Sequence, residues 1–416
     1  MAHLSPLLKQ ATPVIADRGD GALIFDEQDR RYLDFTAGIG VTSTGHAHPD
    51  VVAAAQAQIG KIIHAQYTTV MHRPLLDLVE RMSEVLPAGL DSMFFVNSGS
   101  EAVEAALRLA RQATGRPNVI TFHGGFHGRT VAAASMTTSG TKFRSGFAPL
   151  MPGVHVAPFP NPTHYGWSQE ESTRFALREL DYLLQTISAP QDTAAFLIEP
   201  VLGEGGYVPA SAEFMAGLRE RADRHGILLV LDEVQTGWGR TGRFWGHQHF
   251  DVTPDVLVTA KGIASGFPLS GIAASEELMS RAWPGSQGGT YGANAVACAA
   301  ALATLDVMQR EDLVANARDR GEQLRARLET SADRYAQITD VRGLGLMLGA
   351  EFRTPEGEPD GATAARAQQA AAEHGLLLLT CGAWSQVVRF IPALVVTQAQ
   401  VDEAADLWER TLTSVL

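Results

Sequence analysis

The chain has 416 residues, 45% of them hydrophobic and 19% charged, with a formal net charge of -13, which allows a large buried core and predicts more than one domain. The excess of acidic residues and the lack of a Lys/Arg run argue against a nucleic-acid-binding protein, and no apolar stretch is long enough to cross a membrane. Two cysteines, Cys298 and Cys381, give no disulfide framework, and Met1 to Asp20 lacks the apolar core of a secretion signal, so we expect a cytoplasmic protein.

Short apolar segments and amphipathic helices alternate along most of the chain. Two strands are expected near the N-terminus, at residues 22–26 and 31–35, on either side of a polar turn. Helical spacing of apolar residues predicts helices at residues 101–113 and 211–225, among others. The expected strands between the helices are residues 92–96, 118–122, 153–157, 194–198, 227–231, 256–258 and 271–274. Strands this short and apolar are typical of a mostly parallel sheet covered by helices on both faces, so we predict an α/β fold with a seven-stranded sheet.

The C-terminal part is predicted to form a smaller α+β domain. One or two long helices are expected over residues 300–330. The expected strands that follow are residues 338–341, 346–352, 376–379 and 387–391, and the expected helices lie near 362–373 and 398–416. We therefore divide the chain into residues 1–47, a segment that packs with the small domain, residues 48–305, the large domain, and residues 306–416, the small domain.

Lysine is scarce in this sequence, which narrows the search for a reactive amine. Only four of the 33 Lys and Arg residues are lysines, at positions 9, 61, 142 and 261. Lys261 follows an expected buried strand and has almost no polar neighbours in the sequence. Burial lowers the pKa of an amine, which lets it act as a nucleophile or as a Schiff-base partner. The alternative is an ordinary surface lysine at the end of a strand.

Two further signals come from the ends of other expected strands. Asp232 ends the most apolar one, and ligands of open α/β sheets bind outside such strand ends. Gly99 and Ser100 open a helix, where backbone amides and the helix dipole favour a phosphate. Both signals have simpler explanations: Asp232 could be a loop acid or a helix cap, and Ser98 with Glu101 matches a capping box that needs no ligand.

An amine, an acid and an anion seat at one edge of a sheet together fit pyridoxal phosphate. Its aldehyde requires a lysine, its pyridine nitrogen requires a carboxylate that keeps it protonated, and its phosphate requires amides and hydroxyls. We therefore predict this cofactor from Lys261, Asp232, Gly99 and Ser100.

Several longer blocks of sequence recur in the same order in a known family. They are Asn97-Ser-Gly-Ser-Glu-Ala, Gly125-Phe-His-Gly-Arg-Thr, Ile198-Glu-Pro-Val-Leu-Gly-Glu-Gly-Gly, Asp232-Glu-Val-Gln-Thr-Gly-Trp-Gly-Arg-Thr-Gly, Ala260-Lys-Gly-Ile-Ala-Ser-Gly-Phe-Pro-Leu, Gly289-Thr-Tyr-Gly-Ala-Asn and Val388-Arg-Phe-Ile-Pro. Over nearly its whole length the chain resembles the class III aminotransferases, which use pyridoxal phosphate and have fold type I, and most of all the 4-aminobutyrate aminotransferases. The resemblance implies a homodimer or a dimer of dimers with shared active sites.

The resemblance also implies which residues hold the cofactor. Lys261 would form the Schiff base and carry the proton transfer, and Asp232 would hold the pyridinium nitrogen. The other implied cofactor-binding residues are Gly99, Ser100, Phe126, His127, Glu199, Val234, Gln235 and, from the neighbouring subunit, Thr290.

Two carboxylates have to be recognised if the amino group of an ω-amino acid moves to 2-oxoglutarate, giving a semialdehyde and glutamate by a ping-pong mechanism. The resemblance suggests Arg129 for the distal carboxylate and Arg389 for the carboxylate beside the reacting carbon, and guanidinium pairs well with both. Glu204 would neutralise Arg389 while the ω-amino acid is bound, and Ile39 would line the pocket. Leu202 and Trp238 differ from many members of the family and leave the amino donor open.

Other readings of the motifs remain within the family and outside it. Acetylornithine, ornithine and diaminobutyrate aminotransferases and some amino-acid racemases share the same blocks. A dinucleotide-binding reading of residues 237–242 fits G-x-G-x-x-G, but a Gly-interrupted aromatic segment follows in place of a helix. Close histidine pairs such as His247 and His249 lack a completing ligand set, so we expect no metal.

Overall fold

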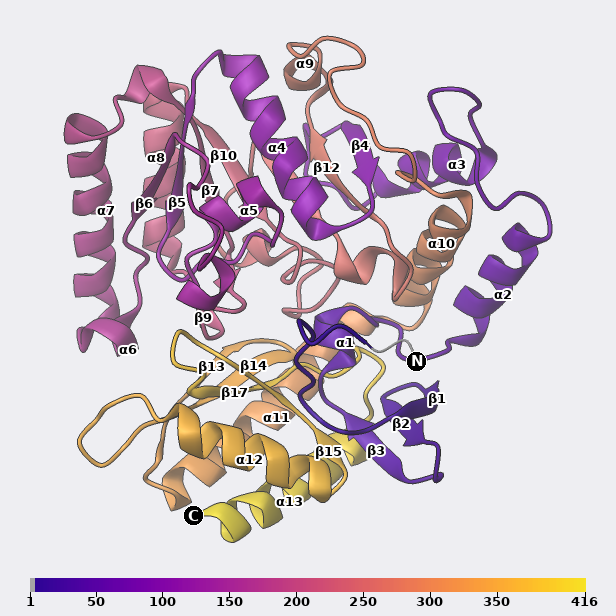
Figure 1. The fold of residues 1–416 in the computed structure, drawn as a ribbon, viewed down its shortest axis with the longest axis vertical. Helices are drawn as coiled ribbons and strands as arrows, with labels where there is room; N and C mark the ends of the chain where they lie inside the picture. The colour runs from indigo at the N-terminus through magenta and orange to yellow at the C-terminus, as the bar shows by residue number, and fades with distance from the viewer. Residues whose placement is uncertain (1–3) are drawn as a thin grey trace.

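The computed structural model describes residues 4–416, so Met1–His3 of the expected N-terminal segment lie outside the described residues. At its centre is a seven-stranded sheet with the order β4-β12-β11-β10-β7-β5-β6 (Figure 1). Strand β12 runs antiparallel to both of its neighbours, and the other pairs are parallel. The strands are β4 (Ser92–Val96), β5 (Asn118–Phe122), β6 (Val154–Ala157), β7 (Thr193–Ile198), β10 (Leu228–Asp232), β11 (Val256–Thr259) and β12 (Ser270–Ala274). The predicted α/β class and mostly parallel sheet are confirmed.

Helices cover both faces of this sheet because successive strand residues point to opposite sides. Val230 of β10 packs in one apolar cluster with α4 (Gly99–Thr114). Its neighbour Leu229 packs in another with α7 (Gln169–Thr186) and α8 (Ala212–His225). Figure 1 shows α4 on one side of the sheet and α7 with α8 on the other. The carboxyl ends of the parallel strands are thereby left as the open edge.

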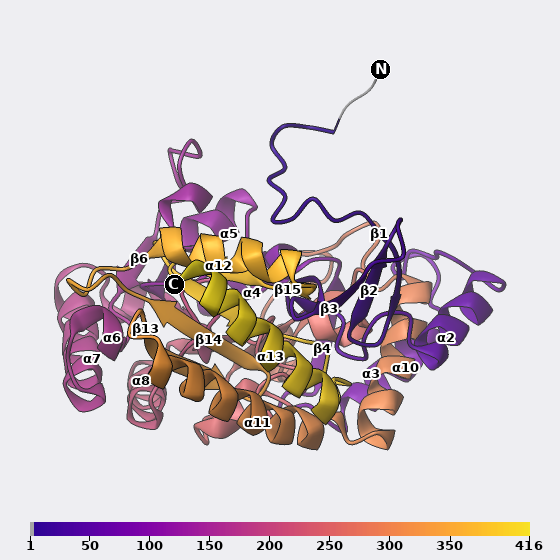
Figure 2. The same ribbon diagram turned by 90° about the horizontal axis from the view of Figure 1, so that it is seen from below.

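A second sheet, order β13-β14-β17-β16, is entirely antiparallel. Its strands are β13 (Ile338–Leu344), β14 (Met347–Phe352), β16 (Leu379–Cys381) and β17 (Val387–Phe390), and the helices that cover it are α11 (Leu313–Arg334), α12 (Gly361–Glu373) and α13 (Gln398–Val415). Figure 2 shows these three helices side by side. Trp408 of α13 fixes the packing, because its buried ring lies 5.2 Å from that of Phe390 and 6.2 Å from that of Phe352.

The two ends of the chain share a third sheet. The N-terminal strands β1 (Ala16–Asp20), β2 (Leu23–Asp26) and β3 (Arg31–Asp34) form an antiparallel meander, and β3 pairs in parallel with β15 (Leu376–Leu377). The expected single strand at residues 376–379 is therefore wrong. Leu377 pairs with Asp34, whereas Leu379 pairs with Arg389 of the other sheet, so the chain changes partners at Leu378.

Helix α10 (Ala295–Arg310) and α11 are separate helices, because Asp312 between them has a left-handed backbone with φ +48°. The remaining elements are α1 (Ala37–Gly40), α2 (Pro49–Ile59), α3 (Arg73–Met82), α5 (Val131–Met136), α6 (Pro162–Tyr165), α9 (Glu276–Met279), β8 (Val201–Leu202) and β9 (Val208–Pro209). Among residues 4–416, no helix is both long enough and apolar enough to span a bilayer.

Candidate functional site

A cavity of about 300 Å³ lies at the carboxyl edge of the seven-stranded sheet. Loops that follow β4, β5, β7, β10 and β11 form most of its wall. The predicted cofactor-binding residues in the wall are Gly99, Ser100, Phe126, His127, Glu199, Asp232, Val234, Gln235 and Lys261. The sequence reasoning did not single out the other lining residues. They are Val41, Asn97, Ser98, Val103, Gly128, Ala260 and residues 266–269, and all except Val41 and Val103 lie inside blocks that carried the family resemblance.

Asp232 is held rigidly at the end of β10. Its side chain is 3% exposed, and its Oδ2 lies 2.8 Å from Nδ1 of His127. Its Oδ1 accepts a hydrogen bond of 3.1 Å from the backbone N–H of Val234. The Nε2 atom of His127 is buried and has no hydrogen-bond partner within residues 4–416. An acid fixed in this way can face a cationic nitrogen in the cavity.

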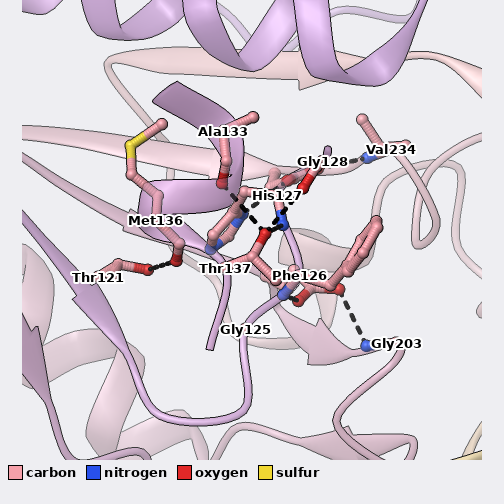
Figure 3. Close-up of polar contacts among 12 residues, drawn as sticks. Thr121, Gly125, Phe126, His127, Gly128, Ala133, Met136, Thr137, Gly203 and Val234 are labelled. Atoms are coloured by element: carbon pink, nitrogen blue, oxygen red, sulfur yellow. Dashed lines mark hydrogen bonds and ion pairs between the residues drawn. The ribbon is translucent and has the colours of Figure 1, made fainter. Parts of the chain in front are cut away.

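A second carboxylate, Glu199, links the loop of Phe126 in the cavity wall to the turn at Gly203 outside it. Its Oε1 accepts a hydrogen bond of 2.7 Å from the N–H of Phe126, and its Oε2 accepts one of 2.9 Å from the N–H of Gly203 (Figure 3). Burial raises the pKa of Glu199 to about 7, His127 opposes the rise, and Asp232 adds to it. Through its hydrogen bond to the N–H of Phe126, the carboxyl group of Glu199 anchors this loop.

Lys261 opens the short 3-10 turn Lys261–Ala264 that follows β11, with φ +43°. Its amine reaches the cavity from the strand next to that of Asp232. Burial lowers the pKa of Lys261, and the charge of Arg389 acts in the same direction, while Glu204 opposes the shift. The lowered pKa suits an amine that has to lose its proton before it attacks a carbonyl carbon.

The start of helix α4 supplies the anion seat. The capping box that offered a simpler explanation is present: Ser98 and Glu101 cap each other's backbone N–H groups. Gly99 and Ser100 lie between them in the cavity wall, so capping and anion binding are compatible. A side chain at Gly99 would press on Val234, because a Cβ there would lie 3.2 Å from Cγ1 of Val234.

Gln235 adds a further unsatisfied atom, since its buried Oε1 has no partner in the described part of the chain. Together with His127 Nε2, this leaves two buried polar atoms in the wall of the cavity without a hydrogen bond, which is unusual unless a ligand completes them. A fixed acid, an amine of lowered pKa, a helix N-terminus and unsatisfied polar atoms are the chemistry that pyridoxal phosphate needs. The residues present therefore fit the predicted cofactor.

Arg389 and Glu204 form an ion pair near the cavity, and Arg389 is buried on β17. Burial acts to raise the pKa of Glu204, but the charge and hydrogen bond of Arg389 outweigh it and keep the pKa below its usual value. Burial acts to lower the pKa of Arg389, and Glu204 more than compensates. Nε of Arg389 is buried without a partner within residues 4–416, so the guanidinium can take a further acceptor.

Five predicted site residues do not line the cavity of a single chain: Glu204 and Arg389, which form the ion pair beside it, and Arg129, Ile39 and Thr290. Arg129 is exposed, and its guanidinium lies 4.7 Å from the centre of the Phe143 ring, which in turn lies edge-on to Phe126. Ile39 is 43% exposed in a left-handed turn with φ +70°. Thr290 is exposed. Their roles stay predictions.

Glu233 was not singled out from the sequence, although it follows Asp232 directly. Its fully buried carboxyl group accepts hydrogen bonds from the N–H groups of Gly246 and His247, at 2.8 and 2.7 Å, and from the hydroxyl of Thr236. Burial raises its pKa to about 7. The group braces the loop that leaves Asp232, and only the pattern of two adjacent acids after an apolar strand hinted at it.

The dinucleotide-binding alternative fails on geometry, because residues 237–242 form turns and a short 3-10 segment follows them at Gly246–His249. No helix begins there to receive a pyrophosphate. Among residues 4–416, the side chains of His, Cys, Asp and Glu form no group of three that could hold a metal ion.

Comparison with known proteins shows which family the chain resembles. The family model described as Aminotransferase class-III matches residues 7–412. The 4-aminobutyrate aminotransferase of Escherichia coli is 40% identical over 96% of this chain and 93% of its own length, and the 5-aminovalerate aminotransferase of Pseudomonas putida is 38% identical over 98% and 95%. A PLP-bound amine transaminase from an uncultivated Pseudomonas species superposes with a TM-score of 0.93 at 30% identity, covering 100% of this chain and 99% of that one.

Proposed function

The chain belongs to the class III aminotransferases, and from this membership and the geometry of the cavity we propose that it moves the amino group of an ω-amino acid to 2-oxoglutarate. The relatives named for 4-aminobutyrate and 5-aminovalerate support the choice of donor. The products are a semialdehyde and glutamate, formed in two half-reactions of a ping-pong cycle.

Pyridoxal phosphate supplies an aldehyde that condenses with amines and a ring that withdraws electrons from the bond that breaks. Asp232 would hold the ring nitrogen in its protonated form, and Gly99 and Ser100 at the start of α4 would hold the phosphate. Phe126 would lie against the ring, and Val234 and Gln235 would contact its oxygen.

Lys261 performs the proton transfers. With its pKa lowered, Nζ would accept the proton from the amine-bearing carbon of the donor in the first half-reaction. In the second half-reaction it would deliver a proton to the carbon of the keto acid that receives the amino group. His127 and Glu199 keep the charge and position of the surrounding groups fixed, because Nδ1 of His127 lies 2.8 Å from Asp232 and Glu199 holds the N–H of Phe126.

The ion pair of Glu204 and Arg389 is the single observation that carries the choice of substrates. An ω-amino acid has only a CH2 group beside its reacting carbon, so Arg389 needs Glu204 as a partner while that substrate is bound. 2-Oxoglutarate brings a carboxylate to the same place and can replace Glu204. We assign the distal carboxylate of both substrates to Arg129, which has to turn away from Phe143 to reach it.

The test is a panel of amino donors with 2-oxoglutarate or pyruvate as acceptor. We expect 4-aminobutyrate or 5-aminovalerate to give glutamate, with parallel lines in double-reciprocal plots. Preference for N-acetylornithine or diaminobutyrate would assign the chain to those branches instead. Racemisation of an amino acid without any keto acid would contradict the proposal.

We also propose a homodimer in which Thr290 completes the cavity of the neighbouring subunit. Support comes from apolar side chains that stand exposed on two adjoining segments. The exposed residues are Ile59, Ile62, Ile63, Val70, Met71, Trp283 and Tyr291. The segments touch, since Nδ2 of Asn294 donates to the carbonyl oxygen of Ile63, and such patches mark interfaces. A cytoplasmic location is part of the same proposal, in keeping with two buried free thiols.

The division at residues 47 and 305 is retained as a proposal. The seven-stranded sheet falls between these limits, and the strands of the antiparallel sheet lie beyond the second. The parallel pair of β3 with β15 supports placing residues 1–47 with the small domain.

A further inference from the structure

The loop Gly125–Gly128 carries two side chains of the cofactor site and is fixed at several points. Its Phe126 is bonded through the backbone to Glu199, and its His127 is paired with Asp232. Gly128 has φ +129°, and a Cβ there would lie 2.3 Å from Oγ of Ser100, so the glycine lets the loop lie close against the predicted phosphate-binding residue Ser100. Small movements of this loop would therefore displace groups on three sides of the cavity.

Thr137 is hydrogen-bonded to the C-terminal half of the loop Gly125–Gly128. It follows α5 directly and is fully buried. Its Oγ1 accepts a hydrogen bond of 2.9 Å from the N–H of His127. The same oxygen lies 3.1 Å from the carbonyl oxygens of both Gly128 and Ala133, so its one proton is shared between two acceptors. Figure 3 shows Thr137 between the end of α5 and the residues of the loop.

The next residue holds the other half of the loop. Oγ1 of Thr138 donates to the carbonyl oxygen of Phe122, at 2.6 Å, and accepts from the N–H of Gly125, at 3.1 Å. The N–H groups of Thr138 and Ser139 both donate to the carbonyl oxygen of Gly125. Thr138 therefore holds Gly125, whereas the backbone N–H of His127 is held by Thr137.

We propose that Thr137 is a positioning residue of the cofactor site, which acts by setting the place of the His127 ring against Asp232. The ring is buried and is bonded at Nδ1 to Asp232, while its Nε2 has no partner in the described part of the chain, so a shift of the His127 backbone would be passed directly to the contact with Asp232. Without the hydroxyl of Thr137, the buried N–H of His127 loses its acceptor, and the backbone moves to find another. The inference rests on the cofactor assignment of the proposed function and not on the identity of the amino donor.

Thr137→Val removes the hydroxyl and keeps the shape of the side chain. The matched control is Thr121→Val, because Thr121 is equally buried and donates to the carbonyl oxygen of Met136 at the end of the same helix, but its hydroxyl makes no bond to the loop (Figure 3). Thr137→Ser restores the hydroxyl and serves as the rescue. Apoenzyme of each variant is titrated with pyridoxal phosphate, and the dissociation constant, the visible spectrum of the bound cofactor and the thermal midpoint of the apoenzyme are measured.

We expect Thr137→Val to weaken cofactor binding about tenfold and to shift the visible spectrum, with Thr137→Ser within threefold of the wild type. Thr121→Val is expected to lower the apoenzyme midpoint to a similar extent and to leave cofactor binding within twofold. Equal dissociation constants and spectra for the two Val variants would overturn the inference and leave Thr137 a purely structural residue. If Thr137→Val does not fold, Thr137→Cys gives the same comparison, because a thiol fills the site but bonds weakly. Failure of the wild-type apoenzyme to bind pyridoxal phosphate would contradict the cofactor assignment itself.

Discussion

Arg389 of β17 is paired with Glu204, which lies in the turn between β8 and β9, so the ion pair joins the antiparallel sheet to a turn of the large domain. The partners are 185 residues apart in the chain. A buried guanidinium is costly without an anion, and the pair satisfies it while no second carboxylate is present. In the proposed reaction this pair would open when 2-oxoglutarate brings its own carboxylate.

Arg389→Gln should separate the two half-reactions. We expect KM for 2-oxoglutarate to rise by roughly 30-fold or more, because a charge-assisted bidentate contact is lost, and KM for the ω-amino donor to change severalfold at most. The two constants are obtained by varying each substrate at a saturating level of the other. Equal increases in both would contradict the assignment of Arg389 to the carboxylate beside the reacting carbon.

Glu204→Gln should impair the half-reaction of the ω-amino donor more than that of 2-oxoglutarate. The variant leaves the charge of Arg389 uncompensated when an ω-amino acid is bound, so we expect kcat/KM for that donor to fall about tenfold. The 2-oxoglutarate half-reaction, in which Glu204 has to move aside, is expected to stay the same or become faster. Stopped-flow measurement of each half-reaction checks this, and a loss confined to the keto acid would rule out the proposed exchange of partners.

Lys261→Ala is predicted to bind pyridoxal phosphate without the covalent link and to lose transamination by at least about 1,000-fold, since no other lysine among residues 4–416 lines the cavity. The control is Lys9→Ala, which removes an exposed lysine far along the chain from the site and should keep wild-type activity. Mass spectrometry after borohydride reduction locates the linked lysine. Labelling of any other lysine would disprove the assignment.

The pH dependence of stability tests the buried acid Glu233. Its pKa is raised to about 7 in the folded chain, so its contribution to stability is fully present below about pH 4.5 and is lost as the pH rises through about 7. Glu233→Gln does not titrate. We therefore expect the thermal midpoint of this variant, relative to the wild type, to be several degrees higher at pH 8 than at pH 5, and a constant difference would show that Glu233 does not change its charge in this window.

The sequence predicted the central sheet well because its strands are short and mostly apolar and alternate with amphipathic helices. Asp232 and Lys261 could be placed at its edge for the same reason, since Asp232 is the last residue of β10 and Lys261 comes two residues after the end of β11. The split between β15 and β16 could not be predicted, because Leu376 to Leu379 is uniformly apolar and only pairing with distant strands divides it.

The residues that support the site could not be predicted from the sequence either. Thr137 accepts a hydrogen bond from the backbone of His127, ten residues earlier in the chain. A Thr at the end of a helix does not by itself predict such a bond. The position of Arg129 depends on its stacking with Phe143, which no local pattern encodes. Residues that act on the cofactor directly carried a chemical signature, whereas those that hold them in place did not.

The most direct test of the proposed reaction is to mix the enzyme loaded with pyridoxal phosphate and 4-aminobutyrate alone, without a keto acid, and to follow the visible spectrum. We predict that the cofactor band converts to that of the pyridoxamine form with release of one equivalent of succinic semialdehyde per site, and that 2-oxoglutarate then restores the original band and yields glutamate. No spectral change with 4-aminobutyrate or any other ω-amino acid would contradict the proposed function.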